Sequence, residues 1–326
     1  MKKHALALAV LALPGLALAD GPTLYGQLNV TLDSLDKESA TATEAWQLNS
    51  WSSRIGVKGD ADTGVQGLKG LYYAEFGIDV DDGTGPFSQR NIYAGLKGGF
   101  GTLRAGKIDT PVKDAQGKVD QFNDLSGDIQ NLVGGENRSN NIIYYTTPKL
   151  ADAVTVNLSV APAEDTNVDG EAGNEDGIAD TLSASVVYEQ GSVYLALGYD
   201  QDQAIGGYSP DGITRGDIVR LVGTLKGDAF EAGLLFTTAE TNGAGGLEDQ
   251  GVLVSGAFKN GNWKVKGQYG VNEGDTTGVE KTITALGVDY ALGKSTTTYG
   301  YYTAVDTDAA TDTTDTTIGV GLLQKF

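Results

Sequence analysis

The sequence predicts an all-β protein, a 16-stranded antiparallel transmembrane β-barrel. Three observations lead to this prediction. Apolar and polar residues alternate with a period of two along many segments, as in strands whose two faces meet different surroundings. The connections between these segments are alternately long and short, which is the layout of outer-membrane barrels. The N-terminus has the pattern of an export signal, and no later run of about 18 apolar residues could form a transmembrane helix.

Residues 1–19 are predicted to be a signal peptide. Lys2 and Lys3 form a short basic region, and the apolar stretch that follows ends in the small-x-small cleavage site Ala17-Leu18-Ala19. The alternative is a membrane anchor, but the apolar run is too short to span a bilayer. We therefore expect residues 20–326 to form one exported domain.

The composition argues against several classes of function. Removal of the signal peptide removes the single histidine, His4, and the chain has no cysteine. An exported chain without imidazole or thiol cannot build a Ser-His-Asp site, a Cys-His site or a zinc site of His and Cys ligands. A pair of carboxylates could hydrolyse glycosides, but nothing singles out such a pair among 43 acidic residues. The formal net charge of −20 argues against nucleic acid as a partner. We expect no enzyme, no cofactor and no metal site.

The strands are assigned in order from the alternation. In Thr23–Asp33, Leu28 and Val30 share one face while Gln27 and Asn29 share the other. The same pattern places strands at residues 23–33, 52–60, 67–80, 88–97, 101–107, 139–148, 153–161, 181–189, 192–200, 216–226, 229–239, 250–259, 262–271, 279–291, 295–305 and 316–326. Tilted strands of about 9–11 residues cross a bilayer, so these lengths suit a membrane barrel.

The connections sort by length. Asn260-Gly261 is typical of a two-residue hairpin turn. The other short connections include residues 98–100, 190–191, 227–228 and 291–294. The long connections lie at residues 34–51, 81–87, 108–138, 162–180, 201–215, 240–249, 272–278 and 306–315. Two of them, at 163–180 and 306–315, are strongly acidic. A solvated outer rim explains this acidity, and a divalent-cation bridge to lipid head groups is the alternative.

The connection at residues 108–138 is the longest, and loops of about 30 residues in a compact β-protein are usually functional. Besides acidic residues it carries Val119, Phe122, Ile129 and Leu132, at spacings that allow a short helix. A purely solvated loop has no need of these apolar side chains. We expect the loop to pack against another surface, such as the inner barrel wall.

Several segments resemble the Gram-negative general (diffusion) porin family. They are Thr23-Leu24-Tyr25-Gly26-Gln27-Leu28, residues 53–59, residues 90–103, residues 140–148 and the closing residues 320–326. The resemblance implies a 16-stranded barrel that assembles as a homotrimer, with the third external loop folded into the pore. It also implies that the terminal Phe326 is recognised by the outer-membrane assembly machinery.

Basic and acidic residues are expected to face each other across the pore. Alternation with lipid-facing neighbours turns Arg54 and Arg104 inward, while the resemblance implies the same for Arg90 and Arg138. The acidic side is expected from the folded loop, namely from Asp120, Asp124 and Asp128. Opposed charges across a narrow aqueous gap create a transverse field that favours dipolar solutes.

These expectations predict an outer-membrane channel for passive diffusion of ions and small hydrophilic solutes. Its expected partners are outer-membrane lipid and lipopolysaccharide, two further copies of itself and the assembly machinery. A substrate-selective channel is the nearest alternative, although no aromatic or basic ladder is evident in the sequence. The acidity of the chain favours cations and the basic wall opposes them, so we expect at most a weak preference for cations.

Overall fold

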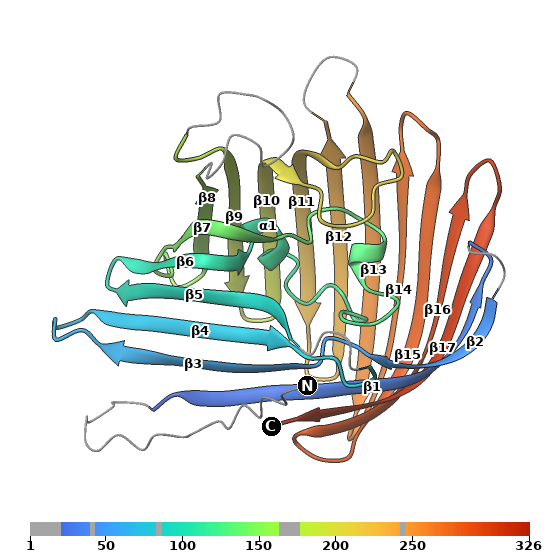
Figure 1. The fold of residues 1–326 in the computed structure, drawn as a ribbon, viewed down its shortest axis with the longest axis horizontal. Coiled ribbons are helices and arrows are strands. Elements are labelled where there is room, and N and C mark those ends of the chain that lie inside the picture. Colours follow the sequence, from blue (N-terminus) through green and yellow to red (C-terminus); the bar gives the residue numbers. More distant parts are fainter. Residues whose placement is uncertain (1–20, 40–42, 83–86, 163–176, 242–245) are drawn as a thin grey trace, which may run out of the picture.

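A computed structural model describes residues 21–39, 43–82, 87–162, 177–241 and 246–326. The predicted signal peptide, residues 1–19, lies outside these ranges. The described strands form one antiparallel sheet, which closes into a barrel because the last strand pairs with the first (Figure 1). The strands are β1 (Thr23–Lys37), β2 (Thr43–Ser50), β3 (Arg54–Asp62), β4 (Lys69–Gly77), β5 (Ser88–Gly98), β6 (Gly101–Asp109), β7 (Arg138–Thr146), β8 (Val154–Ala161), β9 (Thr181–Gln190), β10 (Val193–Ala204), β11 (Arg215–Lys226), β12 (Phe230–Glu240), β13 (Glu248–Asn260), β14 (Trp263–Gly274), β15 (Glu280–Ala291), β16 (Thr296–Asp308) and β17 (Thr313–Lys325).

The 17 segments make 16 barrel strands, because β2 and β3 both pair with β1 and together form one interrupted strand. The predicted strand number is therefore confirmed. The predicted loop at residues 34–51 is wrong, since β1 continues to Lys37 and β2 pairs with that extension. The extension and its partner carry several polar residues on both faces, so the alternation that marks a lipid-facing strand is weak there.

Long and short connections alternate as predicted over the middle of the chain, although most long ones are shorter than expected. The prediction is wrong near the two ends, where residues 38–42 and 309–312 are no longer than the turns at 63–68 and 292–295, respectively. The strands run on past the alternating segments, so that β10 reaches Ala204 and β16 reaches Asp308. Gly261 and Asn262 form the tight turn predicted at Asn260-Gly261, one position further along, and Gly261 has a φ of 60°. We call the end of the barrel with the short turns the turn end, and the other the loop end. Thr23, where β1 begins, and the terminal Phe326 both lie at the turn end.

The two faces of the barrel differ as the alternation predicts. The outward face exposes large apolar side chains, among them Leu195, Leu221, Leu234 and Val254. The inward face buries polar groups instead, for example Gln268 on β14. No helix in the described part of the chain is long and apolar enough to cross a membrane.

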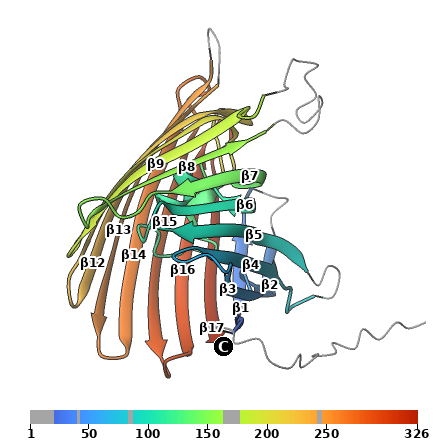
Figure 2. The ribbon, with the colours of Figure 1, turned by 90° about the vertical axis from the view of Figure 1, so that its left-hand side faces the viewer.

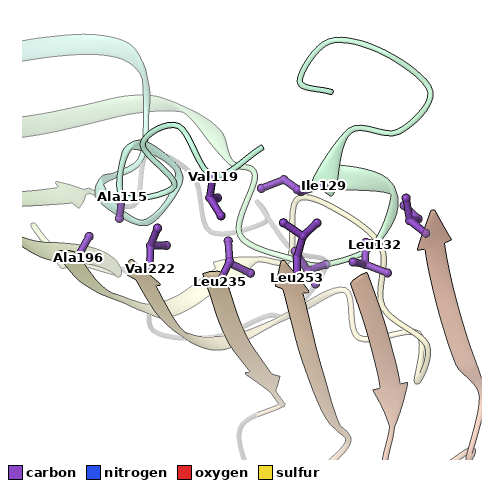
Figure 3. Packing of buried hydrophobic residues seen from close by; sticks show 10 residues of the cluster. Ala115, Val119, Ile129, Leu132, Ala196, Val222, Leu235 and Leu253 are labelled. Atoms are coloured by element: carbon purple, nitrogen blue, oxygen red, sulfur yellow. The ribbon is translucent and has the colours of Figure 1, made fainter. Parts of the chain in front are cut away.

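The hydrophobic core lies inside the barrel, between its wall and the connection at residues 110–137, which we call the inner loop. The inner loop contains the short helix α1 (Pro111–Asp114) and the 3-10 turn η1 (Ile129–Asn131). Its apolar side chains point at the strands, as Figure 3 shows for Val119 towards Leu235 and for Leu132 towards Leu253. The predicted packing of this loop against the wall is therefore observed.

Glycines on the wall leave room for this contact. A Cβ atom at Gly251 on β13 would lie 2.4 Å from Cγ1 of Val133, and one at Gly270 on β14 would lie 2.4 Å from Cδ2 of Leu132. Such distances are far inside van der Waals contact, so a side chain at either site would displace the loop. The missing side chains thus let the inner loop lie flat on the strands.

Candidate functional site: the pore constriction

One buried ion pair fastens the end of the inner loop to the wall. Arg220 on β11 is fully buried, and its Nη1 lies 2.7 Å from Oε1 of Glu136. Its Nη2 donates to the carbonyl oxygen of Gly134 at 2.6 Å. Removing one partner of such a pair costs about 3–5 kcal/mol, because the remaining charge stays buried without compensation. This pair holds the loop backbone on the side of the barrel formed by β10–β16.

Amide side chains of the wall fix the middle of the loop. Gln268 on β14 donates from Nε2 to the carbonyl oxygen of Gly127 at 2.7 Å, and its Oε1 accepts from the Gln121 amide at 2.9 Å. Asn272, four residues further along the same face of β14, donates from Nδ2 to the carbonyl oxygen of Leu132 at 2.7 Å. The loop's backbone groups therefore find partners inside the barrel rather than in water.

The wall opposite the inner loop is formed by β3–β7, which lie side by side in Figure 2. The sequence positions of these strands include Arg54, Arg90, Arg104 and Arg138. Three irregularities in the strands lie close to them. The strand formed by β2 and β3 is interrupted at Ser52, whose backbone has a φ of 48°. The register of β4 with β5 shifts between Ala74 and Phe76, next to Arg90, and that of β6 with β7 shifts between Gly106 and Ile108. Bulges of this kind re-aim side chains, and they recur next to functional sites.

Arg54 spans the gap between wall and loop. Its Nη1 lies 3.2 Å from Oδ2 of Asp124 in the inner loop, and its Nε lies 3.7 Å from Oε2 of Glu75 on the wall. Both Arg54 and Asp124 remain about one-fifth exposed at the side chain. The structure thus brings together one predicted arginine and one predicted aspartate across the lumen.

Two other arginines, Arg90 and Arg138, form ion pairs with carboxylates of the wall rather than of the inner loop. Nε of Arg90 lies 2.6 Å from Oε1 of Glu75, and Nε of Arg138 lies 2.9 Å from Oδ1 of Asp109. Neither forms an ion pair with the predicted loop aspartates within the described residues. A cavity of about 250 Å³ lies between these groups and the loop. Its lining includes Arg54, Arg90, Arg138, Lys113, Asp109, Asp124, Asp128 and Glu136.

Asp120 and Asp128 form no ion pair with the wall arginines among the described residues. Their carboxylates instead accept hydrogen bonds from backbone amides of the inner loop itself. Asp120 accepts from the amides of Phe122 and Ile129 at 2.8 and 3.0 Å, and Asp128 accepts from Asp124 and Gln130 at 2.7 and 2.8 Å. Burial raises the pKa of both carboxyl groups, and their mutual repulsion adds to the rise for Asp120. Asp128 still lines the cavity, whereas Asp120 holds the shape of the loop.

Arg104 lies apart from the cavity lining, nearer the turn end. Its guanidinium stands over the ring of Tyr144, 4.0 Å from the centroid, and 5.4 Å from that of Tyr93. The Tyr93 ring stacks in turn on Tyr73 with centroids 5.1 Å apart, and Tyr73 meets Tyr25 at 6.0 Å. The sequence showed no aromatic ladder because these tyrosines come from separate strands, which only the closed sheet brings side by side.

The sequence reasoning missed four charged members of the site: Glu75, Asp109, Lys113 and Glu136. The alternation along residues 67–80 already turned Glu75 inward, so its charge on that face was the available signal. For Glu136 no local signal existed, since its partner Arg220 lies 84 residues away. No group of three or more His, Cys, Asp or Glu side chains in the described ranges is placed to hold a metal ion.

Phe326 closes the barrel seam rather than the pore. Its amide and carbonyl oxygen bond to those of Gly26 on β1, with distances of 3.1 and 2.9 Å. The ring covers Gly26, where a Cβ atom would lie 2.4 Å from its Cζ. About half of the ring remains exposed.

Comparison with known proteins agrees with this geometry. The profile of the Gram-negative porin family matches residues 5–310. Outer membrane porin protein 32 of Delftia acidovorans is 28% identical over 319 residues, which cover 92% of this chain and 88% of the relative. The major outer membrane protein P.IB of Neisseria gonorrhoeae is 29% identical over 182 residues. That match covers 53% of this chain and 51% of the relative, so the chain spans about half the length of the P.IB relatives.

Solved structures share the fold. An anion-selective porin from Comamonas acidovorans superposes with a TM-score of 0.80 at 21% identity, over 94% of this chain and 99% of that one. The outer membrane protein OmpT of Vibrio cholerae, in its trimer form, superposes with a TM-score of 0.65 at 20% identity, over 94% and 99% of the two chains. With the family profile matched over nearly the whole chain and the barrel closed in the same way, this chain belongs to the Gram-negative porins.

Proposed function

We propose that the protein is an outer-membrane channel through which ions and small hydrophilic solutes diffuse passively. The observation that carries the proposal is the charged cavity between the inner loop and the wall, with Arg54 and Asp124 on opposite sides. A family of channels and a closed barrel with a polar interior support the same function. No residue is proposed to be catalytic.

The mechanism follows from how the charges are fixed. Glu75 accepts from Arg90 and from the hydroxyl groups of Tyr25 and Tyr73, so the wall is held rigidly. The loop side is held by the hydrogen bonds that Asp128 accepts from backbone amides and by the ion pair of Arg220 with Glu136. Fixed charges of opposite sign orient the dipole of a passing polar solute, whereas an apolar solute gains nothing in return for losing water. The constriction thereby admits small hydrophilic molecules and disfavours apolar ones.

A second candidate is a channel selective for anions. Arg54, Arg90 and Arg138 gather on one wall, and the Comamonas acidovorans relative is described as anion-selective. Each of these arginines faces a carboxylate, which offsets its charge. The ion preference therefore depends on the net charge of the constriction. The reversal potential in a salt gradient measures this preference directly.

The proposed partners follow from the family. We propose that three copies assemble in the outer membrane, as in the trimer form of OmpT. Lipid would contact the outward apolar side chains, and lipopolysaccharide would contact the acidic loop end. The terminal Phe326 is proposed to be recognised by the assembly machinery, and its half-exposed ring is consistent with this role.

The test is conductance of the purified protein in planar lipid bilayers. Insertion in groups of three conductance steps, with conductance proportional to salt concentration, is expected. A unit charge about 8 Å from a permeant ion is worth about 0.5 kcal/mol in water, with opposite sign for an anion and a cation, so Arg54→Gln should change the anion-to-cation permeability ratio about fivefold towards cations. Lys149→Gln is the matched control, because Lys149 and its partner Glu189 lie at the exposed turn end. A protein that folds in detergent and yet gives no conductance would contradict the proposal.

A further inference from the structure

The charges of the barrel are divided along its axis. We infer that this channel rectifies ion current, passing cations more readily from the loop end to the turn end and anions more readily the other way. The inference rests on the proposed function, since it requires an open aqueous pore. It concerns the direction of flow, which neither the family nor the constriction by itself determines.

The turn end is basic. Within the described residues its cations include a set that forms no ion pair with a carboxylate: Lys58, Lys97, Arg104, Lys259, Lys294 and Lys325. The carboxylates of this end are fewer than its cations. Asp60, Glu189 and Asp289 each pair with one lysine, and Asp62, Asp152 and Asp228 form no ion pair among the described residues. Glu231 lies 3.6 Å from Nζ of Lys226 and 3.5 Å from Nζ of Lys264, so one negative charge faces two positive ones.

Aromatic rings hold two of these cations in the lumen. Nζ of Lys58 lies over the ring of Tyr25, 4.8 Å from the centroid, and Arg104 lies over Tyr144 and beside Tyr93. An aromatic face attracts a cation through its quadrupole but carries no net charge. These contacts therefore position the positive charges without cancelling them, unlike the arginine–carboxylate pairs of the constriction.

The loop end is acidic. Along β14–β17 alone it carries a group of carboxylates without an ion pair among the described residues: Asp275, Glu280, Asp306, Asp308, Asp312 and Asp315. The cation on this part of the rim, Lys281, lies over the ring of Tyr208, 3.6 Å from the centroid.

A pore with a negative half and a positive half joined at a constriction conducts unequally in the two directions. When the loop end is at positive potential, cations enter through the negative half and anions through the positive half, so both accumulate at the constriction. With the opposite potential each ion must enter through the half that repels it, and the constriction is depleted. Screening limits the effect, since the Debye length is about 10 Å at 0.1 M salt and about 3 Å at 1 M.

The test is the current–voltage curve of channels of known orientation. The chain has no cysteine, so Ala310→Cys in the exposed connection between β16 and β17 gives a single thiol at the loop end. A bulky maleimide added to one chamber lowers the current only if that chamber faces the loop end, which fixes the orientation. At 0.1 M salt we expect about twofold more current with the loop end positive, and nearly equal currents at 1 M.

Charge variants identify the origin of the asymmetry. The triple variant Lys58→Gln, Lys97→Gln, Lys259→Gln removes unpaired cations of the turn end, and its current ratio at 0.1 M salt is expected to fall towards one. The matched control is Asp60→Asn with Lys69→Gln, which removes an ion pair of 3.4 Å without changing the net charge. The control is expected to keep the asymmetry.

Conducting channels with equal currents at 0.1 M salt, or with the larger current at the opposite potential, would overturn the inference and leave the proposed function standing. A triple variant that rectifies like the unaltered protein would also overturn it. Absence of any conductance would overturn the proposed function and this inference together.

Discussion

Asp114, at the end of α1, shows how a single buried carboxyl ties the inner loop to the wall. Its Oδ2 accepts from the hydroxyl group of Tyr144 on β7 at 3.0 Å. Burial, with repulsion from Asp109 added, raises the pKa of Asp114 to about 7. The loop is therefore seated with a carboxyl group that is neutral in mildly acidic solution and charged in mildly alkaline solution.

This raised pKa predicts a loop that is held less firmly as the pH rises. The pKa of Asp114 in the folded protein exceeds that of an unfolded aspartate, about 3.9, so the folded state binds more protons and loses stability as pH rises through 7. Between pH 6 and 8 the free energy of unfolding falls by about 1.4 kcal/mol, which corresponds to a shift of one pKa unit. We expect faster hydrogen exchange of the α1 amides at pH 8, after correction for intrinsic rates, and Asp114→Asn should remove this pH dependence. The exposed substitution Asp79→Asn is the control, and equal protection at both pH values would contradict the prediction.

At the scale of the element, the inner loop and the strands beneath it fit as two surfaces. Its apolar side chains fill the spaces above wall glycines, while wall amides bond its backbone. The bulged strands opposite do the converse, turning polar side chains into the lumen. The narrowness of the pore is therefore a property of a loop and a wall together.

A side chain placed between the loop and β13 should push the loop into the lumen and so narrow or destabilise the constriction. Gly251→Val introduces a Cβ that would meet Val133 at 2.4 Å, so the loop must shift. Overpacking of this kind costs about 1–3 kcal/mol. We expect a smaller and noisier single-channel current with altered ion selectivity, because the loop is displaced from β13 towards the lumen. Gly223→Ala is the matched control, because its Cβ meets only Leu195 at 3.5 Å. A Gly251→Val channel with unchanged current and selectivity would show that the loop does not set the pore.

At the scale of the whole molecule, closure of the sheet decides what the chain can do. Pairing of β1 with β17 removes the free edges of the sheet. Their backbone N–H and C=O groups would otherwise have no hydrogen-bond partners in the membrane. It also separates an outward apolar surface from an aqueous interior. The last residue of the chain contributes to this closure through its bonds to Gly26.

Phe326 is expected to matter more for assembly in the cell than for the finished barrel. Phe326→Ala keeps the backbone bonds to Gly26 and removes only a half-exposed ring, so the refolded barrel should lose little heat stability, about 1 kcal/mol. In cells the same variant should reduce the amount of folded protein in the outer membrane severalfold. The measurements are heat-modified gel mobility of refolded protein and of outer-membrane fractions. An equal loss in both would indicate a purely structural role for the ring.

The sequence by itself determined the fold class, the number of barrel strands and the position of the inner loop. These features depend on local patterns, because each strand must alternate between lipid and water whatever its neighbours are. The same argument turned Arg54 inward, although the break at Ser52 that ends β2 escaped it. Family resemblance added Arg90 and Arg138, which line the cavity.

Only the tertiary structure decided which charges meet. Arg54 faces Asp124, while Asp120 bonds the loop's own amides, because the register of the loop depends on packing against strands that follow it by about a hundred residues or more. The partnership of Glu136 with Arg220 has the same origin. Periodicity reports which face of a strand a residue occupies, whereas distances across a lumen depend on closure of the whole sheet.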